Sequence, residues 1–263
     1  MKIQKVEAAK KQMFIVHLSD GQKFRAHEES VVRYRLISGR ELDEDELDEI
    51  MEGISYDEAY IKALKYISYK LRSKYEVEQY LLDGDFMEQV AAHTVDRLMQ
   101  EGYIDDKRYA EALKNTMLNT TLKGPGLLQR ELKKHRLNQF LIDEAVRDFD
   151  DSIDADRMNK IKDKELKKYK GAYRQFQMKL KEKMMVKGYM NHHFELIDFN
   201  DDFDDTSFFE KDFEKYYNKY RTRESGWKLK SKLIQSLLRK GYNYQLIEEK
   251  IGGIEDEIFE HDD

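Results

Sequence analysis

Apolar residues recur every three or four positions through most of the chain from Tyr56 onward, as they do along one face of an α-helix. The clearest such series are Tyr173, Phe176, Leu180 and Met184, followed by Leu229, Leu233 and Leu237. The first thirty residues differ, because β-prone segments flank the turn signal Ser19-Asp20-Gly21 and residues 2–8 could add a third strand. We therefore predict a mainly α-helical protein with a small β element at its N-terminus.

A short phrase recurs between the apolar segments. Lys187-Gly188-Tyr189-Met190 returns 53 residues later as Lys240-Gly241-Tyr242-Asn243, and the looser Lys134-His135-Arg136-Leu137 lies the same distance before it. Glycine readily adopts the left-handed conformation that ends a helix, so we predict that the phrase is a helix stop followed by a packed tyrosine. This register pairs apolar residues of different copies: Leu127 with Leu180 and Leu233, Leu132 with Met185 and Leu238, Phe140 with Leu246, and Leu141 with Ile247.

An internal period of about 50 residues indicates stacked supersecondary units rather than one compact core. We predict an N-terminal extension at residues 1–52, with the sheet, a short helix after Ser30 that ends at Gly39, and an acidic helix at residues 41–53. Four three-helix repeats follow in this prediction, at residues 53–104, 105–150, 151–205 and 206–263, the last with an acidic tail. Each repeat buries its faces against neighbouring repeats, so we expect an elongated array and a monomer.

The composition limits the class of protein. Charged residues make up 38% of the chain, against roughly 25% in typical globular domains, so much of the chain must be solvated surface. The absence of Cys excludes disulfides and thiolate metal sites and favours a reducing compartment. Without a signal-peptide pattern or an apolar run of membrane-spanning length, we expect a cytoplasmic protein with no membrane partner.

The net charge of −6 conceals segregated charges. Residues 156–190 carry twelve Lys and Arg against four acids, whereas residues 192–210 carry seven acids and no Lys or Arg. Such blocks usually form solvated helix faces, but they can also present complementary fields to a partner that carries both signs.

Motifs of common enzymes are missing. The sequence has no phosphate-binding loop of the G-x-x-x-x-G-K-[ST] type, no H-E-x-x-H and no G-x-S-x-G. His192 and His193 with Glu195 could be imagined as metal ligands, but adjacent residues of a helix or strand point apart. We therefore expect no catalytic residues, no cofactor and no metal site.

Three segments of the chain resemble the RecX family of bacterial recombination regulators: ALKYISYKLRSKYEVEQYL from Ala63, VDRLMQEGYIDDKRYAEAL from Val95 and KGPGLLQRELKKHRL from Lys123. Their order and spacing together are specific, and the chain is similar to the longer versions of the family. Most matching residues have structural interpretations, since Ser73 and Glu76 form a capping box and Gly124-Pro125 separates helices. His135 stands where the family usually has Gly, so that helix stop needs another geometry.

The resemblance implies an all-helical array of three-helix repeats. It also implies binding to the RecA recombinase filament, across neighbouring protomers, and modulation of filament assembly, ATP hydrolysis and strand exchange. In that role the protein would act in DNA repair and the SOS response, and we expect inhibition of RecA. The family has no catalytic residues to carry over to this chain.

A basic stripe supplies the candidate binding residues. Lys179, Lys183 and Lys187 lie four residues apart on one flank of a predicted helix, beside its apolar face. In the register given above, this flank is basic in two further repeats, and Arg72 belongs to a segment that resembles the family. The remaining candidates for contacts with a partner or with DNA are Arg130, Lys134, Lys232 and Lys240. Solubility and pairing with helix dipoles explain the stripe equally well.

Two alternatives to a filament regulator remain open. The first is a helical repeat protein that contacts single-stranded or double-stranded DNA directly through the basic stripe, although the acidic blocks argue against tight binding of naked DNA. Aromatic residues interleave with cations in YYNKYRTRESGW, as in base-stacking proteins. We assign these aromatics to the core instead, with the least support for Tyr220 and Trp227. The second alternative is a helical scaffold for an unrelated protein.

Overall fold

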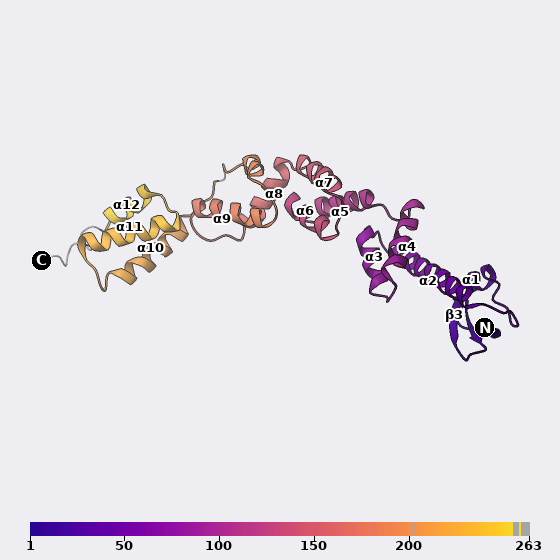
Figure 1. Ribbon diagram of the computed structural model, residues 1–263. Coiled ribbons are helices and arrows are strands. Elements are labelled where there is room, and N and C mark those ends of the chain that lie inside the picture. The colour runs from indigo at the N-terminus through magenta and orange to yellow at the C-terminus, as the bar shows by residue number, and fades with distance from the viewer. Residues whose placement is uncertain (201, 255–257, 259–263) are drawn as a thin grey trace. The chain divides into compact units, whose positions relative to one another are not determined.

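The computed structural model describes residues 1–200, 202–254 and 258 (Figure 1). Three antiparallel strands open the chain, in the order β1 (Ile3–Ala8), β2 (Met13–Leu18) and β3 (Lys23–His27). By its contacts the chain forms two compact units, one of residues 1–113 with 130–145 and the other of residues 114–129 with 146–263. No helix among the described residues combines the length and apolar character that crossing a bilayer requires.

Helices follow the sheet through the rest of the described chain, as predicted. They are α1 (Glu28–Arg33), α2 (Glu44–Ile67), α3 (Lys74–Leu82), α4 (Glu88–Gln100), α5 (Asp106–Thr120), α6 (Pro125–Lys134), α7 (Gln139–Asp151), α8 (Ala155–Leu166), α9 (Tyr173–Val186), the 3₁₀ helix η1 (Asn191–Leu196), α10 (Thr206–Tyr220), α11 (Gly226–Lys240) and α12 (Tyr244–Gly252). The mainly α-helical fold with a small N-terminal sheet is therefore confirmed.

The sheet packs on α2. Val16 and Leu18 of β2 and Ala26 of β3 are buried in one cluster with Leu47, Ile50 and Ile54 of α2. The predicted turn is present, because Gly21 has a φ of 90° between β2 and β3. The first strand also matches the prediction, since Val6 of β1 pairs with Val16.

Two predicted helix boundaries in this extension are wrong. The helix predicted after Ser30 begins at Glu28 and ends at Arg33, and Ser30 is buried inside it, where its hydroxyl donates to Asp57 Oδ2 at 2.9 Å. The helix predicted to end at Gly53 continues to Ile67. Gly53 is needed for packing instead, because the Tyr34 hydroxyl occupies the space that a Cβ atom would take.

The first three-helix core lies between α2, α3 and α4. Ala59 and Ala63 of α2 meet Val77 and Leu81 of α3, and Val95 of α4 closes the cluster. The predicted capping box opens α3, because Ser73 Oγ accepts from the Glu76 backbone N–H at 3.2 Å and Glu76 Oε2 accepts from the Ser73 N–H at 3.1 Å.

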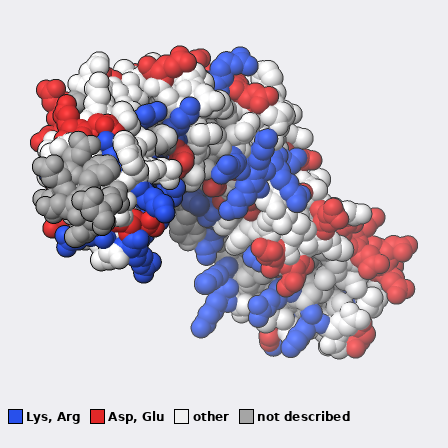
Figure 2. All heavy atoms as spheres, turned by 90° about the vertical axis from the view of Figure 1, so that its left-hand side faces the viewer, with Lys and Arg blue, Asp and Glu red and all other residues white. Residues whose placement is uncertain are grey.

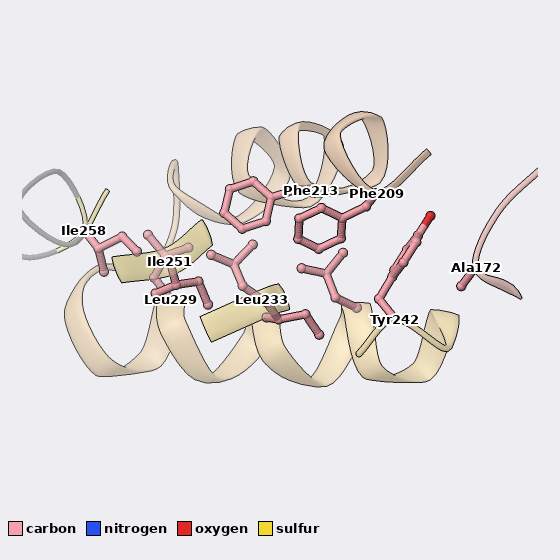
Figure 3. Packing of buried hydrophobic residues seen from close by; sticks show 10 residues of the cluster. Ala172, Phe209, Phe213, Leu229, Leu233, Tyr242, Ile251 and Ile258 are labelled. Atoms are coloured by element: carbon pink, nitrogen blue, oxygen red, sulfur yellow. The ribbon is translucent and has the colours of Figure 1, made fainter. Parts of the chain in front are cut away.

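The last three-helix core lies between α10, α11 and α12 (Figure 3). Phe209 and Phe213 of α10 face Leu229 and Leu233 of α11, and Ile251 of α12 lies between these residues and Ile258 at one end of the cluster. Toward the other end, Tyr242 lies between Phe209 and Ala172, with its ring edge-on to Phe209 at a centroid distance of 5.2 Å. In the predicted third repeat, by contrast, η1 stands where the other repeats have a third α-helix. The four sets of repeat boundaries remain predictions.

The glycine phrase is a helix stop, as predicted. Gly188 follows α9 with a φ of 89° and Gly241 follows α11 with a φ of 94°. In both cases the backbone N–H of the next residue donates a hydrogen bond to the carbonyl five residues before it. The Tyr189 N–H donates to the Met184 carbonyl at 3.0 Å, and the Tyr242 N–H donates to the Leu237 carbonyl at 3.2 Å. Both tyrosines are buried.

The same bond pattern identifies three further stops without glycine, after α1 at Arg35, after α3 at Asp85 and after α6 at Arg136. Arg136 has a φ of 53°, and the Leu137 N–H donates to the Leu132 carbonyl at 3.3 Å. Asp85 has a φ of 64°, and the Phe86 N–H donates to the Leu81 carbonyl at 3.3 Å. The helix stop of the second repeat thus uses Arg136 instead of His135, which agrees with the prediction that His135 requires another geometry.

The predicted register of the second repeat is therefore wrong by one residue. Leu132 is equivalent to Met184 and Leu237, which are all buried, whereas the predicted partners Met185 and Leu238 are 52% and 43% exposed. The same correction pairs Leu128 with Leu180 and Leu233, and Ile142 with Ile247; Phe140 and Leu141 were therefore paired with the wrong residues. The cause is that a left-handed arginine ends α6, and it carries no glycine to mark the position.

The second helix of a predicted repeat is called its middle helix here: α3, α6, α9 and α11. The stops after α6, α9 and α11 each contact the N-terminus of the middle helix of the preceding repeat. At α6, the Gly124 N–H donates to the Lys187 carbonyl at 2.7 Å and the Gly126 N–H to the Gly188 carbonyl at 2.9 Å. At α9, an added Cβ on Gly241 would lie 3.0 Å from the Gln175 nitrogen. At α3, side chains make the contact, because His135 Nδ1 lies 3.4 Å from Ser73 Oγ and Arg136 lies 4.6 Å over the Tyr75 ring.

We predict that Gly188→Ala destabilises the protein more than Gly102→Ala does. Both glycines have positive φ, 89° and 77°, so each alanine costs about 1–2 kcal/mol of backbone strain. Only at Gly188 would the new Cβ meet backbone, 2.6 Å from the Leu127 nitrogen, and overpacking adds roughly 1–3 kcal/mol. Urea denaturation of both variants measures the difference. Equal losses of stability would show that the close approach at Gly188 is unimportant.

Candidate partner-binding surface

The candidate cations of α9 face the helix that precedes it. Lys183 Nζ lies 2.9 Å from Glu165 Oε2, and Lys187 Nζ lies 3.6 Å from Glu165 Oε1. The hydrogen bond from Lys183, together with both ammonium charges, lowers the pKa of the Glu165 carboxyl. Lys179 lies 5.7 Å over the Tyr169 ring. This part of the stripe therefore packs against α8 and the segment after it.

The candidate cations of α11 have the same kind of partner. Lys232 pairs with Glu224 in the turn between α10 and α11, and Lys240 Nζ lies 3.7 Å from Asp212 Oδ1 of α10. Lys240 and Lys187 are equivalent residues, as are Lys232 and Lys179. The structure thus places the stripe on equivalent flanks of α9 and α11, as predicted.

The extension of the stripe to α6 is wrong. When the register of the second repeat is corrected by one residue, Arg130 becomes equivalent to Glu182 and Lys134 to Val186. These positions lie one residue before Lys183 and Lys187, so the two α6 cations point away from the flank of those lysines. Both are exposed, and within the described part of the chain neither forms an ion pair. They form a separate basic surface on α6.

Arg72 has a structural environment. Its Nη1 lies 3.1 Å from Glu76 Oε1, and its guanidinium lies 3.9 Å over the Tyr66 ring. His135 Nδ1 lies 3.9 Å from the other Glu76 oxygen. Arg72 therefore stabilises the α3 N-terminus at the contact between the first two predicted repeats.

Charges of both signs share the surface. On the face drawn in Figure 2, groups of Lys and Arg side chains lie beside groups of Asp and Glu side chains. The ion pairs at Glu165, Glu224 and Asp212 reduce the field of the stripe.

The aromatic prediction was wrong for Trp227, whose side chain is 72% exposed near the start of α11. Tyr220 is partly buried against the C-terminal core, and its hydroxyl lies 2.9 Å from Ser236 Oγ. The interleaving of aromatics and cations around Trp227 was the signal that could have marked it as a surface residue.

His192 and His193 come together, against the prediction that adjacent residues point apart. In η1 their rings lie 4.0 Å apart, with His192 Nε2 2.9 Å from Asp150 Oδ2 and His193 Nε2 3.1 Å from Asp150 Oδ1. These three residues form a group that could hold a metal ion, and Asp150 takes the place expected for Glu195. Sequence could not show this pairing, because Asp150 lies far from the histidines in the chain.

The hydrogen bonds of His193 favour a bridge rather than a metal site. The Met190 N–H donates to His193 Nδ1 at 2.9 Å, so the proton of the neutral ring lies on Nε2, facing Asp150. A metal on Nε2 would need the opposite tautomer. The Asp150 carboxylate therefore links the end of α7 to η1 by its hydrogen bond with His192, and His193 Nε2 lies beside it at 3.1 Å.

Comparisons with known proteins give one consistent set of similarities. Three family descriptions match the chain: "RecX, first three-helix domain" at residues 59–98, "RecX, second three-helix domain" at residues 105–146 and "RecX, third three-helix domain" at residues 211–251. These matches leave out residues 147–210, which contain α8, α9 and η1.

The similarity to curated relatives extends over nearly the whole chain. Regulatory protein RecX of Staphylococcus carnosus strain TM300 is 30% identical over 97% of this chain and 99% of the relative. Regulatory protein RecX of Staphylococcus aureus strain JH9 is 32% identical over 95% of this chain and 94% of the relative.

Solved structures of similar proteins share the fold. A crystal structure of regulatory protein RecX is 29% identical, with a TM-score of 0.61, and covers 74% of this chain and 97% of that chain. The crystal structure of RecX from Lactobacillus salivarius is also 29% identical, with a TM-score of 0.51, and covers 54% and 92%.

We predict that acid lowers the stability of the folded protein through His193, whose ring is buried. Burial, followed by the charge of His192, lowers the pKa of His193. The folded state thus disfavours the protonated ring, so stability present above the unfolded pKa, roughly 6.5, is lost as the pH falls toward the lowered pKa. The melting temperature should fall between pH 7.5 and pH 5.5.

The variant His193→Asn tests this assignment. It removes the titrating ring, so we expect a loss of roughly 1–3 kcal/mol at pH 7.5 and a smaller pH dependence. The matched control His192→Asn changes the exposed neighbour and should keep more of the pH dependence. The same pH dependence in wild type and His193→Asn would contradict the prediction.

Proposed function

Because the chain belongs to the RecX family of regulatory proteins, we propose that it is a non-enzymatic regulator that binds the RecA nucleoprotein filament. The observation that carries this proposal is the similarity over nearly the full chain to relatives that are named regulatory proteins. In this proposal the protein acts as a monomer in the cytoplasm, in DNA repair and the SOS response, and it inhibits RecA.

The mixed charge of the stripe supports a protein-coated partner. Lys183 and Lys232 each lie beside a carboxylate, Glu165 and Glu224, so the flank presents both signs. Naked DNA offers only phosphate charges, whereas a filament of protein on DNA offers charges of both signs. Such a surface suits the filament better than DNA alone.

The repetition of the flank supports binding to a polymer. Equivalent lysines occur at the ends of α9 and α11, Lys187 and Lys240, and the Gly241 stop contacts the start of α9. Repeated surfaces can make the same contact with successive protomers of a regular filament, which adds their binding free energies.

The proposal is tested by DNA-dependent ATP hydrolysis of the cognate RecA while this protein is titrated in. Inhibition that saturates with protein concentration is the expected result. An unchanged hydrolysis rate at saturating protein would contradict the proposed function.

We predict that Lys183→Glu combined with Lys232→Glu weakens filament binding and leaves thermal stability nearly unchanged. Exposed ion pairs typically contribute about 0–1 kcal/mol to folding, so losing two has a small effect on stability. Each glutamate would face the carboxylate that its lysine now pairs with, which reverses the local field. Co-sedimentation with preformed filaments measures binding.

The control for this double variant is Lys10→Glu with Lys23→Glu, two exposed residues of the N-terminal sheet region. It makes the same change in net charge away from α9 and α11, and filament binding should be retained. Equal losses of binding in both double variants, or a parallel loss of stability, would place the binding residues elsewhere.

We predict that filament binding persists to higher salt concentrations than binding of naked single-stranded DNA does. Contacts with phosphates alone are lost steeply with salt, whereas buried apolar contacts with the protein of the filament are screened less. Salt titrations by anisotropy on labelled DNA and by co-sedimentation with filaments give the two slopes, with filament stability controlled. Equal log-log slopes would favour direct nucleic-acid binding as the function.

A further inference from the structure

A hollow of about 310 Å³ opens on the flank shared by α10 and α11. It combines aromatic rings, cations and a hydroxyl, and its lining contains no carboxylate. The lining residues are Tyr216, Lys219, Tyr220, Ser236, Arg239 and Lys240.

One wall of the hollow is aromatic. The rings of Tyr216 and Tyr220 are nearly parallel, with an interplanar angle of 12° and centroids 6.0 Å apart. Both side chains pack in part against the C-terminal core, and the Tyr220 hydroxyl shares a hydrogen bond with Ser236 Oγ at 2.9 Å. These contacts hold the wall in place before any ligand arrives.

The rest of the rim is positively charged. Lys219 Nζ lies 5.2 Å from the Tyr220 ring centroid, and Arg239 is exposed near the end of α11. Lys240 is 3.7 Å from Asp212, but neither Lys219 nor Arg239 forms an ion pair with any residue that the structure describes. Unlike the lysines beside Glu165, these two cations have no neutralising acid, so an anion can approach them.

We propose that this hollow binds single-stranded nucleic acid, with a phosphate held by Lys219 and Arg239 and a base packed on the wall of Tyr216 and Tyr220. A guanidinium with a nearby ammonium suits a phosphate, and tyrosine rings take the faces of unpaired bases. An acidic peptide would satisfy the cations but has no planar group for the wall. In a duplex the base faces are stacked on one another, so the wall selects single strands.

The expected binding is weak and local. One neutralised phosphate predicts a log-log salt slope of roughly −0.7 for a single strand. This inference goes beyond the proposed function, because it locates a site at which the protein alone would hold nucleic acid. The experiment omits RecA, so its failure would leave filament regulation untouched.

The test is anisotropy of a fluorescein-labelled oligo-dT strand with the full chain at low salt. We expect Lys219→Glu with Arg239→Glu to weaken binding at least tenfold. Tyr216→Leu should weaken it several-fold, and Tyr216→Phe, which keeps the ring, should restore it. Melting temperatures of all variants show whether each one is folded.

Two matched controls separate the hollow from general charge and general exposure of aromatics. Lys164→Glu with Lys168→Glu makes the same charge change at exposed residues of the α8 region, and Trp227→Ala removes an exposed aromatic of α11 that lies outside the lining. Both controls should bind nearly as wild type does. A loss as large as that of the Lys219 and Arg239 variant would overturn the assignment to this hollow.

Three further outcomes would also overturn the proposal. If the protein bound a duplex of the same length with equal affinity, no unpaired base would contact the tyrosine wall. Competition by free dTTP as strong as that by the oligonucleotide would identify a nucleotide site. If the Lys219 and Arg239 variant kept DNA affinity but lost RecA binding, the hollow would be a protein contact.

Discussion

The contact between the end of one middle helix and the start of the preceding one organises this protein. At its tightest point, the carbonyl groups of Lys187 and Gly188 accept the Gly124 and Gly126 N–H groups. Free carbonyls at a helix C-terminus carry partial negative charge and free N–H groups at an N-terminus partial positive charge, so the two ends satisfy one another. A left-handed residue is required at each stop, because it turns the chain so that the ends can meet.

The three contacts of this kind use different chemistry. Gly188 and Gly241 bring backbone against backbone, where an added Cβ would lie only 2.6 Å from the Leu127 nitrogen and 3.0 Å from the Gln175 nitrogen. At α6 the residues are His135 and Arg136, and the contact passes through their side chains to Ser73 and Tyr75. A contact through side chains tolerates more variation in spacing than one between backbones, so the first two predicted repeats depend less on glycine than the later ones do.

Sequence reasoning predicted the features that depend on neighbouring residues. The hairpin turn at Gly21, the capping box at Ser73 and the stops at Gly188 and Gly241 are local, and each leaves a residue type at a fixed position. The register of the second repeat could not be found this way, since Arg136 adopts a left-handed conformation without a compositional sign. The partners of the candidate cations were equally hidden, because Glu165 and Asp212 lie on other helices.

The acids around the lysines decide how this surface can be used. Where Glu165 lies between Lys183 and Lys187, a partner must compete with an existing ion pair, so binding there gains little from charge alone and requires shape or apolar contact as well. Where Lys219 and Arg239 border the hollow without an acid, charge alone can attract a phosphate. In the proposed function, a filament presents protein and DNA together, so it could engage both kinds of surface at once. In both proposals the distribution of carboxylates, more than the number of lysines, would separate contacts with protein from contacts with nucleic acid.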